Sequence, residues 1–200
     1  MTLDLGDPIA VLLAGAEALA RVGIEAAAYG GLALAAYGAA RETKDADLAV
    51  VSTTGAEAQL ALEGAGVTCR LAFDRIRFGG NRVTRLTLLP EADGAPLNTV
   101  DLVEPLSPRY ARGVNARAVV GTLRAQPIRI VIPEDFVVLK ILSTRERDLE
   151  DAAAVRSALA GRLDVAFVER EIAQLSGEIA DHDIEARWHR ARALGAASRG

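Results

Sequence analysis

One segment, residues 28–50, constrains the fold of this 200-residue chain more than any other. Its sequence is AYGGLALAAYGAARETKDADLAV. The pattern predicts a strand at residues 24–29, a Gly-Gly turn, a helix at residues 32–37 that ends at Gly38, and a strand at residues 44–51. The second strand is apolar on both faces except at Asp45 and Asp47. A buried strand gains nothing from two unpaired carboxylates, so this pair indicates a cation-binding or catalytic site.

Further patterns predict the other elements of a mixed α/β core. Asp7 is a candidate N-cap, with Pro8 as first helical residue and Gly23 as the stop of an N-terminal helix. The remaining expected elements are a helix at residues 56–63, a hairpin at residues 75–89 that turns at Gly79, Gly80 and Asn81, a loop at residues 90–98, and strands at residues 99–103 and 128–132. We expect a core at residues 1–131 and a helical region at residues 132–200 that packs on it.

Composition excludes several classes of protein. The single cysteine, Cys69, leaves no internal disulfide and fits a reducing, cytoplasmic compartment. No apolar run reaches ~18 residues, so we expect no segment to span a membrane. The net charge of −4 argues against a surface that is basic throughout and binds duplex DNA.

The charge is unevenly distributed along the chain. Residues 108–147 contain eight Lys and Arg residues against three Asp and Glu residues. Two interpretations stay open at this point: a solvated basic face, or a local groove for phosphates.

The two aspartates of residues 44–51 predict specific chemistry. Side chains two apart on a strand point to the same face, so Asp45 and Asp47 project side by side. A divalent cation relieves the repulsion between them, and carboxylate oxygens suit Mg²⁺ or Mn²⁺. If the strand at residues 99–103 pairs with this one, Asp101 completes a cluster of three carboxylates. Such clusters hold two metals that promote in-line phosphoryl or nucleotidyl displacement.

Gly30 and Gly31 fit the same interpretation. They follow a predicted strand and open a predicted helix, where a backbone without Cβ atoms can approach a phosphate closely. Each feature alone is also typical of an ordinary turn or strand. The combination of strand, Gly-Gly, helix and Asp-x-Asp is what indicates nucleotide chemistry.

These motifs resemble the DNA polymerase β-like nucleotidyltransferase superfamily, and within it the branch of minimal and abortive-infection type IV toxin-like members. The matching residues in the first motif are Gly30, Gly31, Arg41, Thr43, Asp45 and Asp47. A looser match follows in the segment LKILSTRERDLEDA, at Lys140, Arg145, Arg147, Asp148 and Asp151. The resemblance implies a mixed β-sheet flanked by helices, with a C-terminal helical tail.

The resemblance also implies roles for these residues. Asp45 and Asp47, with Asp101, would bind the catalytic metals. Gly30 and Gly31 would hold the nucleoside triphosphate. The other implied roles are phosphate neutralisation by Lys140, orientation of Lys140 or help to the acceptor by Asp148, and phosphate contact or loop fixation by Arg41 and Thr43.

Two classes of function remain open from the sequence. The first is an enzyme that transfers a nucleoside monophosphate from an NTP to an acceptor hydroxyl. The toxin-like resemblance implies RNA or the tRNA 3′ end as acceptor and an antitoxin as partner, whereas a small antibiotic-type molecule is the alternative. The second class is a non-catalytic nucleotide- or partner-binding module. It is favoured by Leu32, which follows Gly31 where many members of the superfamily place a hydroxyl residue.

Structural interpretations compete with the functional ones at several positions. They are a helix start with Asp148 as its N-cap and Asp151 three residues on, solvent exposure for Lys140 and Arg41, a surface strand position for Asp101, a helix cap or solvated turn for residues 181–183, and packing for Trp188.

Overall fold

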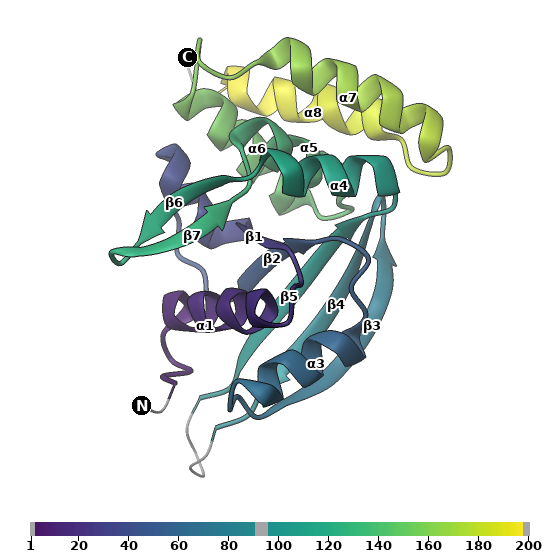
Figure 1. Ribbon diagram of the computed structural model, residues 1–200. Helices are drawn as coiled ribbons and strands as arrows, with labels where there is room; N and C mark the ends of the chain where they lie inside the picture. The colour runs from purple at the N-terminus through teal and green to yellow at the C-terminus, as the bar shows by residue number, and fades with distance from the viewer. Residues whose placement is uncertain (1–2, 91–95, 198–200) are drawn as a thin grey trace.

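The computed structural model describes residues 3–90 and 96–197. In this part of the chain, seven strands form one mixed sheet in the order β3-β4-β5-β2-β1-β7-β6, and helices flank it (Figure 1). The strands are β1 Ala26–Tyr29, β2 Ala46–Val50, β3 Cys69–Phe78, β4 Asn81–Leu88, β5 Asn98–Pro105, β6 Val119–Leu123 and β7 Gln126–Ile130. The helices are α1 Pro8–Arg21, α2 Gly30–Ala33, η1 Leu34–Tyr37 (a 3₁₀ helix), α3 Gly55–Gly64, α4 Pro108–Arg117, α5 Pro133–Leu142, α6 Glu146–Ala158, α7 Val165–Glu178 and α8 Ile184–Ala197.

The sheet contains both parallel and antiparallel pairs. Strand β2 runs antiparallel to β1 and parallel to β5, and β1 runs parallel to β7. The hairpins β3-β4 and β6-β7 form the two outer parts, and β4 continues antiparallel to β5. The strand predicted at residues 99–103 therefore does pair with the one that carries the Asp-x-Asp motif.

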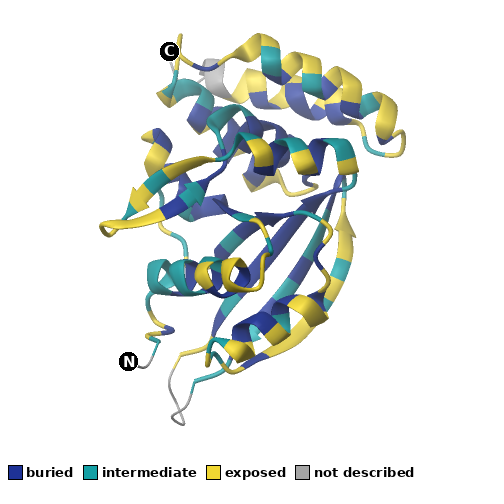
Figure 2. Ribbon diagram, viewed as in Figure 1, coloured by how far each residue is buried: buried dark blue, intermediate teal, exposed yellow. Residues whose placement is uncertain are grey.

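Helices cover both faces of the sheet. Helix α1 packs on one face, where a Cβ at Gly15 would touch Leu48 and Val100. The opposite face receives α5, whose Phe136 ring lies 5.3 Å from that of Tyr29. Figure 2 shows the central strands and α5 as the most buried parts. A single cluster of buried side chains includes residues from the sheet and from α5–α8, so the helices do pack on the core. The domain boundary at residue 131 stays a prediction.

The N-terminal helix follows the expected signals. Asp7 caps α1 and accepts hydrogen bonds from the backbone N–H groups of Ile9 and Ala10, and Pro8 is the first helical residue. Gly23 follows the helix with φ of +79°. Within the described residues, no helix has the length and apolar character that a membrane crossing requires.

Two expectations about the hairpins need correction. Of the three residues expected at the β3-β4 turn, Gly79 has a positive φ of +65°, whereas Asn81 already belongs to β4. Helix α4 and strand β6 were not expected. A signal for α4 was present in the sequence, because Ser107 caps this helix and Pro108 is its first residue. The loop expected at residues 90–98 falls partly outside the described residues, at 91–95.

The helix expected at residues 32–37 ends before Gly38 as predicted, but it begins at Gly30 and is not α-helical throughout. Helix α2 is a four-residue turn, and the chain continues as the 3₁₀ helix η1 up to Gly38, which has φ of +78°. One turn has few aligned peptide dipoles, so a strong phosphate site at its N-terminus is not supported by this element.

Candidate functional site

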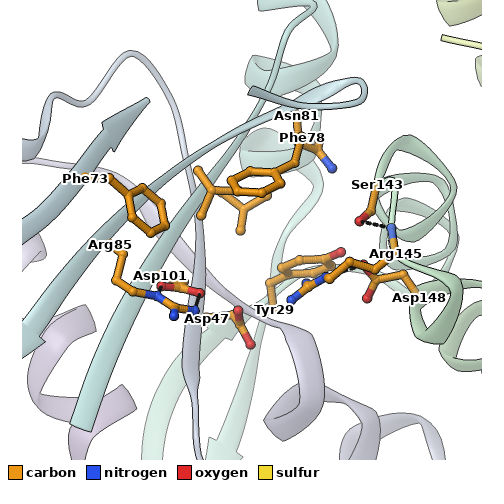
Figure 3. A pocket seen from close by; sticks show the side chains of 12 residues that line it. Tyr29, Asp47, Phe73, Phe78, Asn81, Arg85, Asp101, Ser143, Arg145 and Asp148 are labelled. Atoms are coloured by element: carbon orange, nitrogen blue, oxygen red, sulfur yellow. Dashed lines mark hydrogen bonds and ion pairs between the residues drawn. The ribbon is translucent and has the colours of Figure 1, made fainter. Parts of the chain in front are cut away.

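Five side chains form a row across five neighbouring strands, which we call the cross-strand row. The register pairs Tyr29 of β1 with Asp47 of β2, and Asp47 with Asp101 of β5. It continues from Asp101 to Arg85 of β4 and from Arg85 to Phe73 of β3. Paired residues on neighbouring strands project to the same face, so all five side chains meet on the face opposite α1. Figure 3 shows them lining one cavity.

Asp47 lies in this row, and the nearby positive charges do not offset the effect of burial on its pKa. Burial raises its pKa from an ordinary value of 3.8 to about 7, while Lys140 acts to lower it and Asp101 and Asp45 add to the rise. A carboxylate in such surroundings is stabilised by any cation that binds beside it. The predicted repulsion between the acidic side chains is therefore present in the structure.

The Gly-Gly pair is required by this packing. Gly30 has φ of +69°, and a Cβ there would lie 2.5 Å from the carboxyl carbon of Asp47. A Cβ at Gly31 would lie 2.7 Å from that of Thr43. The two glycines thus make room for the side chains of the Asp-x-Asp strand and its preceding loop. Nucleotide contact by Gly30, Gly31 and Thr43 stays a prediction.

The carboxylates fit a metal only in part. Asp45 lies just before β2, is exposed, and lines the same cavity as Asp47; its Oδ1 accepts a hydrogen bond of 3.3 Å from the Thr99 hydroxyl. Asp101 is 5% exposed and binds Arg85 through two hydrogen bonds of 2.7 and 2.6 Å. Within residues 3–90 and 96–197, no three acidic, His or Cys side chains are arranged to hold a metal ion. Asp101 is held by Arg85, and cation binding by Asp45 and Asp47 stays a prediction.

Lys140 and its partners form a buried charge network next to Asp47. Lys140 is 2% exposed and its Nζ lies 2.7 Å from Asp148 and 3.0 Å from Asp151. Arg41 binds Asp151 with bonds of 2.8 and 3.0 Å, and Arg145 binds Asp148 at 2.9 Å. Burial acts to raise the pKa of both aspartates, but their cationic neighbours hold those pKa values below the ordinary range.

This network decides between several interpretations. Lys140 is not solvated, and Arg41 is half-buried and paired. Asp148 lies in the first turn of α6, but Arg145 holds the N-cap position, so the N-cap interpretation of Asp148 was wrong. Lys140 donates a hydrogen bond of 2.7 Å to Asp148, and the orienting role of Asp148 stays a prediction.

Two cavities meet at Asp47. The first, of about 650 Å³, is polar, and we call it the polar cavity. Its lining residues are Arg41, Glu42, Thr43, Lys44, Asp45, Asp47, Lys140, Arg145, Arg147 and Asp148. The second, of about 250 Å³, is walled by rings and aliphatic side chains, and we call it the aromatic cavity (Figure 3). Its lining residues are Tyr29, Asp47, Phe73, Phe78, Asn81, Val83, Arg85, Asp101, Val103, Ser143, Arg145 and Asp148.

The basic segment of residues 108–147 is largely used in structural contacts. Arg109 binds Glu171 and Glu178, Arg117 binds Asp135, Arg124 binds Asp7, and Arg129 donates to the carbonyl of Asn115. Lys140, Arg145 and Arg147 line the polar cavity. The segment is therefore divided between helix packing and the site, and these residues do not form one continuous phosphate groove.

Sequence reasoning missed part of the site. It gave no role to Tyr29, Phe73, Phe78 or Arg85, although all four line the aromatic cavity. Arg85 could have been recognised as a candidate partner of Asp101, because it lies in the predicted hairpin that precedes the strand of Asp101 in the sequence. Two minor interpretations hold: Asp183 accepts from the N–H of Ala186 at the start of α8, and Trp188 is 4% exposed and packs in the core.

Comparison with known proteins places the fold. No protein-family model matches the sequence, and no curated protein matches it. A solved structure of an antigenic nucleotidyltransferase-like protein from Paracoccidioides brasiliensis is similar, with 21% identity, a TM-score of 0.50, and coverage of 90% of this chain and 92% of that chain.

Two structures of the antibiotic-resistance factor ANT(2'')-Ia have TM-scores of 0.49. Their identities are 15% and 14%, and each match covers 85% of this chain, with 96% and 97% of the other. The second of them contains adenylyl-2''-tobramycin. At a TM-score of 0.50 and 90% coverage, the first likeness shows that this chain has a nucleotidyltransferase-like fold.

Proposed function

We propose that this protein transfers a nucleoside monophosphate from an NTP to an acceptor hydroxyl. The observation that carries the proposal is the position of Asp47, which pairs in register with Asp101 and lies where the polar and the aromatic cavity meet. A carboxylate between a polar cavity that contains several cations and a cavity with aromatic walls suits a reaction between a triphosphate and a second substrate.

Asp45 and Asp47 would hold a divalent cation, Mg²⁺ or Mn²⁺, with Asp101 available only if it leaves Arg85. When bound, the cation supplies charge neutralisation for the triphosphate and the attacking oxygen. The acceptor oxygen forms a bond to the α-phosphorus as the bond from that phosphorus to the bridging oxygen breaks, and pyrophosphate leaves with the electron pair. The hydroxyl proton passes to a carboxylate of the cross-strand row, Asp47 or Asp101, both of which line the aromatic cavity.

The polar cavity suits the triphosphate. Lys44, Arg145 and Arg147 line it and are exposed, so they can approach phosphate oxygens. Arg41 and Lys140 sit deeper and bind Asp151 and Asp148. We assign these two a positioning role: they fix the cavity wall and add positive potential near Asp47.

The acceptor is a separate part of the proposal. The toxin-like resemblance implies RNA or a tRNA end, with an antitoxin as partner. Only three cations of the basic segment line the polar cavity, so support for an RNA groove is weak. The alternative, a small-molecule acceptor, is favoured by the aromatic cavity of about 250 Å³ beside Asp47.

Calorimetry tests the nucleotide half of the proposal. A non-hydrolysable ATP analogue is titrated into the protein with and without Mg²⁺, and into Asp45→Asn, Asp47→Asn and the distant control Asp181→Asn. We expect Mg²⁺-dependent binding that both site variants lose and the control keeps. If the affinity for the ATP analogue depends neither on Mg²⁺ nor on the two aspartates, the result would favour a non-catalytic binding module. That is the interpretation that Leu32, next to Gly31, supports.

A further inference from the structure

The aromatic cavity carries an inference about the acceptor. We propose that it receives a small acceptor whose hydroxyl is borne on a flat apolar ring, with the ring packed against the wall that Phe73 and Phe78 form together and the hydroxyl toward Asp101 and Asp47. The inference rests on the proposed function, because the hydroxyl is placed where nucleotidyl transfer would occur. It goes further in naming the chemical class of the second substrate.

Aromatic rings form much of the wall of the aromatic cavity. Phe73 and Phe78 lie 6.3 Å apart between centroids and are tilted by 53°, and the Arg85 guanidinium lies 5.7 Å from the centroid of Phe73. Figure 3 shows both phenyl rings and the Tyr29 ring facing the same space, with the acidic side chains below. Such surfaces stabilise a planar guest by stacking and by edge contacts.

A bulge in β3 brings the two phenyl rings together. Phe73 and Phe78 are five residues apart, which on a regular strand places them on opposite faces. Here Phe73 pairs with Arg85 and Phe78 with Asn81, which are four residues apart, because β3 contains one extra residue between Phe73 and Ile76. The extra residue turns both rings to one face. Arg75 in this bulge has φ of +51°.

Both rings are only partly covered by the protein itself. Phe78 is 38% exposed and Phe73 is half-buried, although each faces a cavity next to the carboxylates. Exposed aromatic surface at a concave site marks a place where a ligand completes the burial. An apolar ring would remove this surface from water and gain the corresponding hydrophobic free energy.

The charges in the cavity disfavour a guest with several positive charges. Three carboxylates line the cavity: Asp101 is bound to Arg85 on two hydrogen bonds, Asp148 is bound to Lys140 and Arg145, and only Asp47 is left for a cationic group. An amino sugar with several ammonium groups would have to displace these arginines, whereas a neutral or singly anionic ring would not. The volume of about 250 Å³ suits a single ring system.

Three phenols of different charge test the proposal: one neutral, one anionic and one cationic. Phenol, 4-hydroxybenzoate and tyramine are titrated, with tobramycin and a short RNA as comparison probes, and binding is followed by protein amide shifts in NMR. The ATP analogue and Mg²⁺ are present. The variants are Phe73→Ala, which removes a wall, and Val83→Phe, which fills the cavity. Ile76→Ala is the matched control, because Ile76 lies on the same strand, is 48% exposed and does not line the cavity.

We expect phenol and 4-hydroxybenzoate each to bind the wild type and Ile76→Ala with equal affinity. Tyramine should bind more weakly than either of these two compounds. Phe73→Ala and Val83→Phe should weaken binding about tenfold or more. If a variant does not fold, the wild-type shifts still decide, since they must cluster at β3, β4 and β5. The inference is overturned if no phenol binds, or if Phe73→Ala and Val83→Phe both leave the affinity for the phenols unchanged. If the wild-type protein shows no ATP-analogue binding that depends on Asp45 and Asp47, the proposed function itself would be overturned.

Discussion

The carboxyl group of Asp47 occupies the space in which a side chain at Gly30 would begin. A Cβ at Gly30 would lie 2.5 Å from the carboxyl carbon of Asp47 and closer still to its Oδ2. The Gly-Gly turn and the Asp-x-Asp strand are therefore one packing unit, and the position of Asp47 depends on the absence of a side chain at residue 30.

Gly30→Ala tests this dependence. The alanine must adopt φ of +69° and must push Asp47 aside, so we expect both a loss of stability and a loss of Mg²⁺-dependent nucleotide binding. Gly23→Ala is the matched control, because Gly23 has φ of +79° and a Cβ there would meet nothing within 4 Å. Both variants should lose about 1 kcal/mol of unfolding free energy from the backbone alone. Thermal unfolding and calorimetry measure the two effects, and equal losses in both variants would contradict the account.

Asp47→Asn should change how stability depends on pH. The folded protein holds a proton on Asp47 up to about pH 7, while the unfolded chain releases it near the ordinary pKa of 3.8. Unfolding therefore releases a proton between these values, and the stability of the metal-free protein falls as pH rises from about 4 to 7. The loss is on the order of 4 kcal/mol and then levels off.

Asn cannot ionise, so the variant should be more stable than the wild type at pH 8 and similar to it at pH 4. Thermal unfolding across this range, in chelator, measures the difference. Mg²⁺ should raise the midpoint of the wild type at pH 8 and leave that of the variant unchanged. If the stability of the two proteins depended on pH in the same way, Asp47 would not be a group whose pKa is raised in the folded protein.

Replacing Arg85 should strengthen metal binding while it weakens the fold. Arg85→Gln removes the charged partner of Asp101, which is 5% exposed, and should reduce stability by about 1–3 kcal/mol. The freed carboxylate can then join Asp45 and Asp47, so the affinity for Mn²⁺ should rise. Titration with Mn²⁺ followed by electron paramagnetic resonance measures this affinity, and an unchanged value would mean that Asp101 does not reach the cation.

Lys140 and Lys44 should respond differently to the same substitution. Lys140→Met leaves Asp148 and Asp151 buried without their shared cation, and should cost about 3 kcal/mol of stability. Lys44 lines the same polar cavity but is exposed, so Lys44→Met should leave the unfolding free energy unchanged and weaken only nucleotide binding. Chemical denaturation and nucleotide titration separate the two outcomes. A stable Lys140→Met protein would contradict the buried network.

Local sequence signals predicted much of the fold for physical reasons. Caps and stops such as Asp7 and Gly38 act within a few residues, and they lie where the pattern places them. The Asp-x-Asp strand was recognisable because carboxylates in an apolar run are rare. The overlooked helix α4 carried a usable signal as well, in Ser107 followed by Pro108.

The rest of the site depends on distant pairings that local patterns do not contain. Arg85 binds Asp101 only because β4 and β5 align in one register. Phe73 and Phe78 share a cavity only because of the extra residue in β3, and strict alternation would have separated them. The end of the helix at Gly38 was predicted, whereas its start at Gly30 and the 3₁₀ geometry of its second half were not.

Transfer of label from α-³²P NTP tests the central claim most directly. The purified protein is incubated with each labelled NTP, Mg²⁺ or Mn²⁺, and either total cellular RNA or a set of hydroxyl-bearing aromatic compounds, beside an Asp45→Ala/Asp47→Ala control. We predict that label moves to an acceptor only when both aspartates are intact, with a loss on the order of a thousandfold or more in the control. Transfer at an equal rate by the control would contradict the assignment of Asp45 and Asp47 as the catalytic pair.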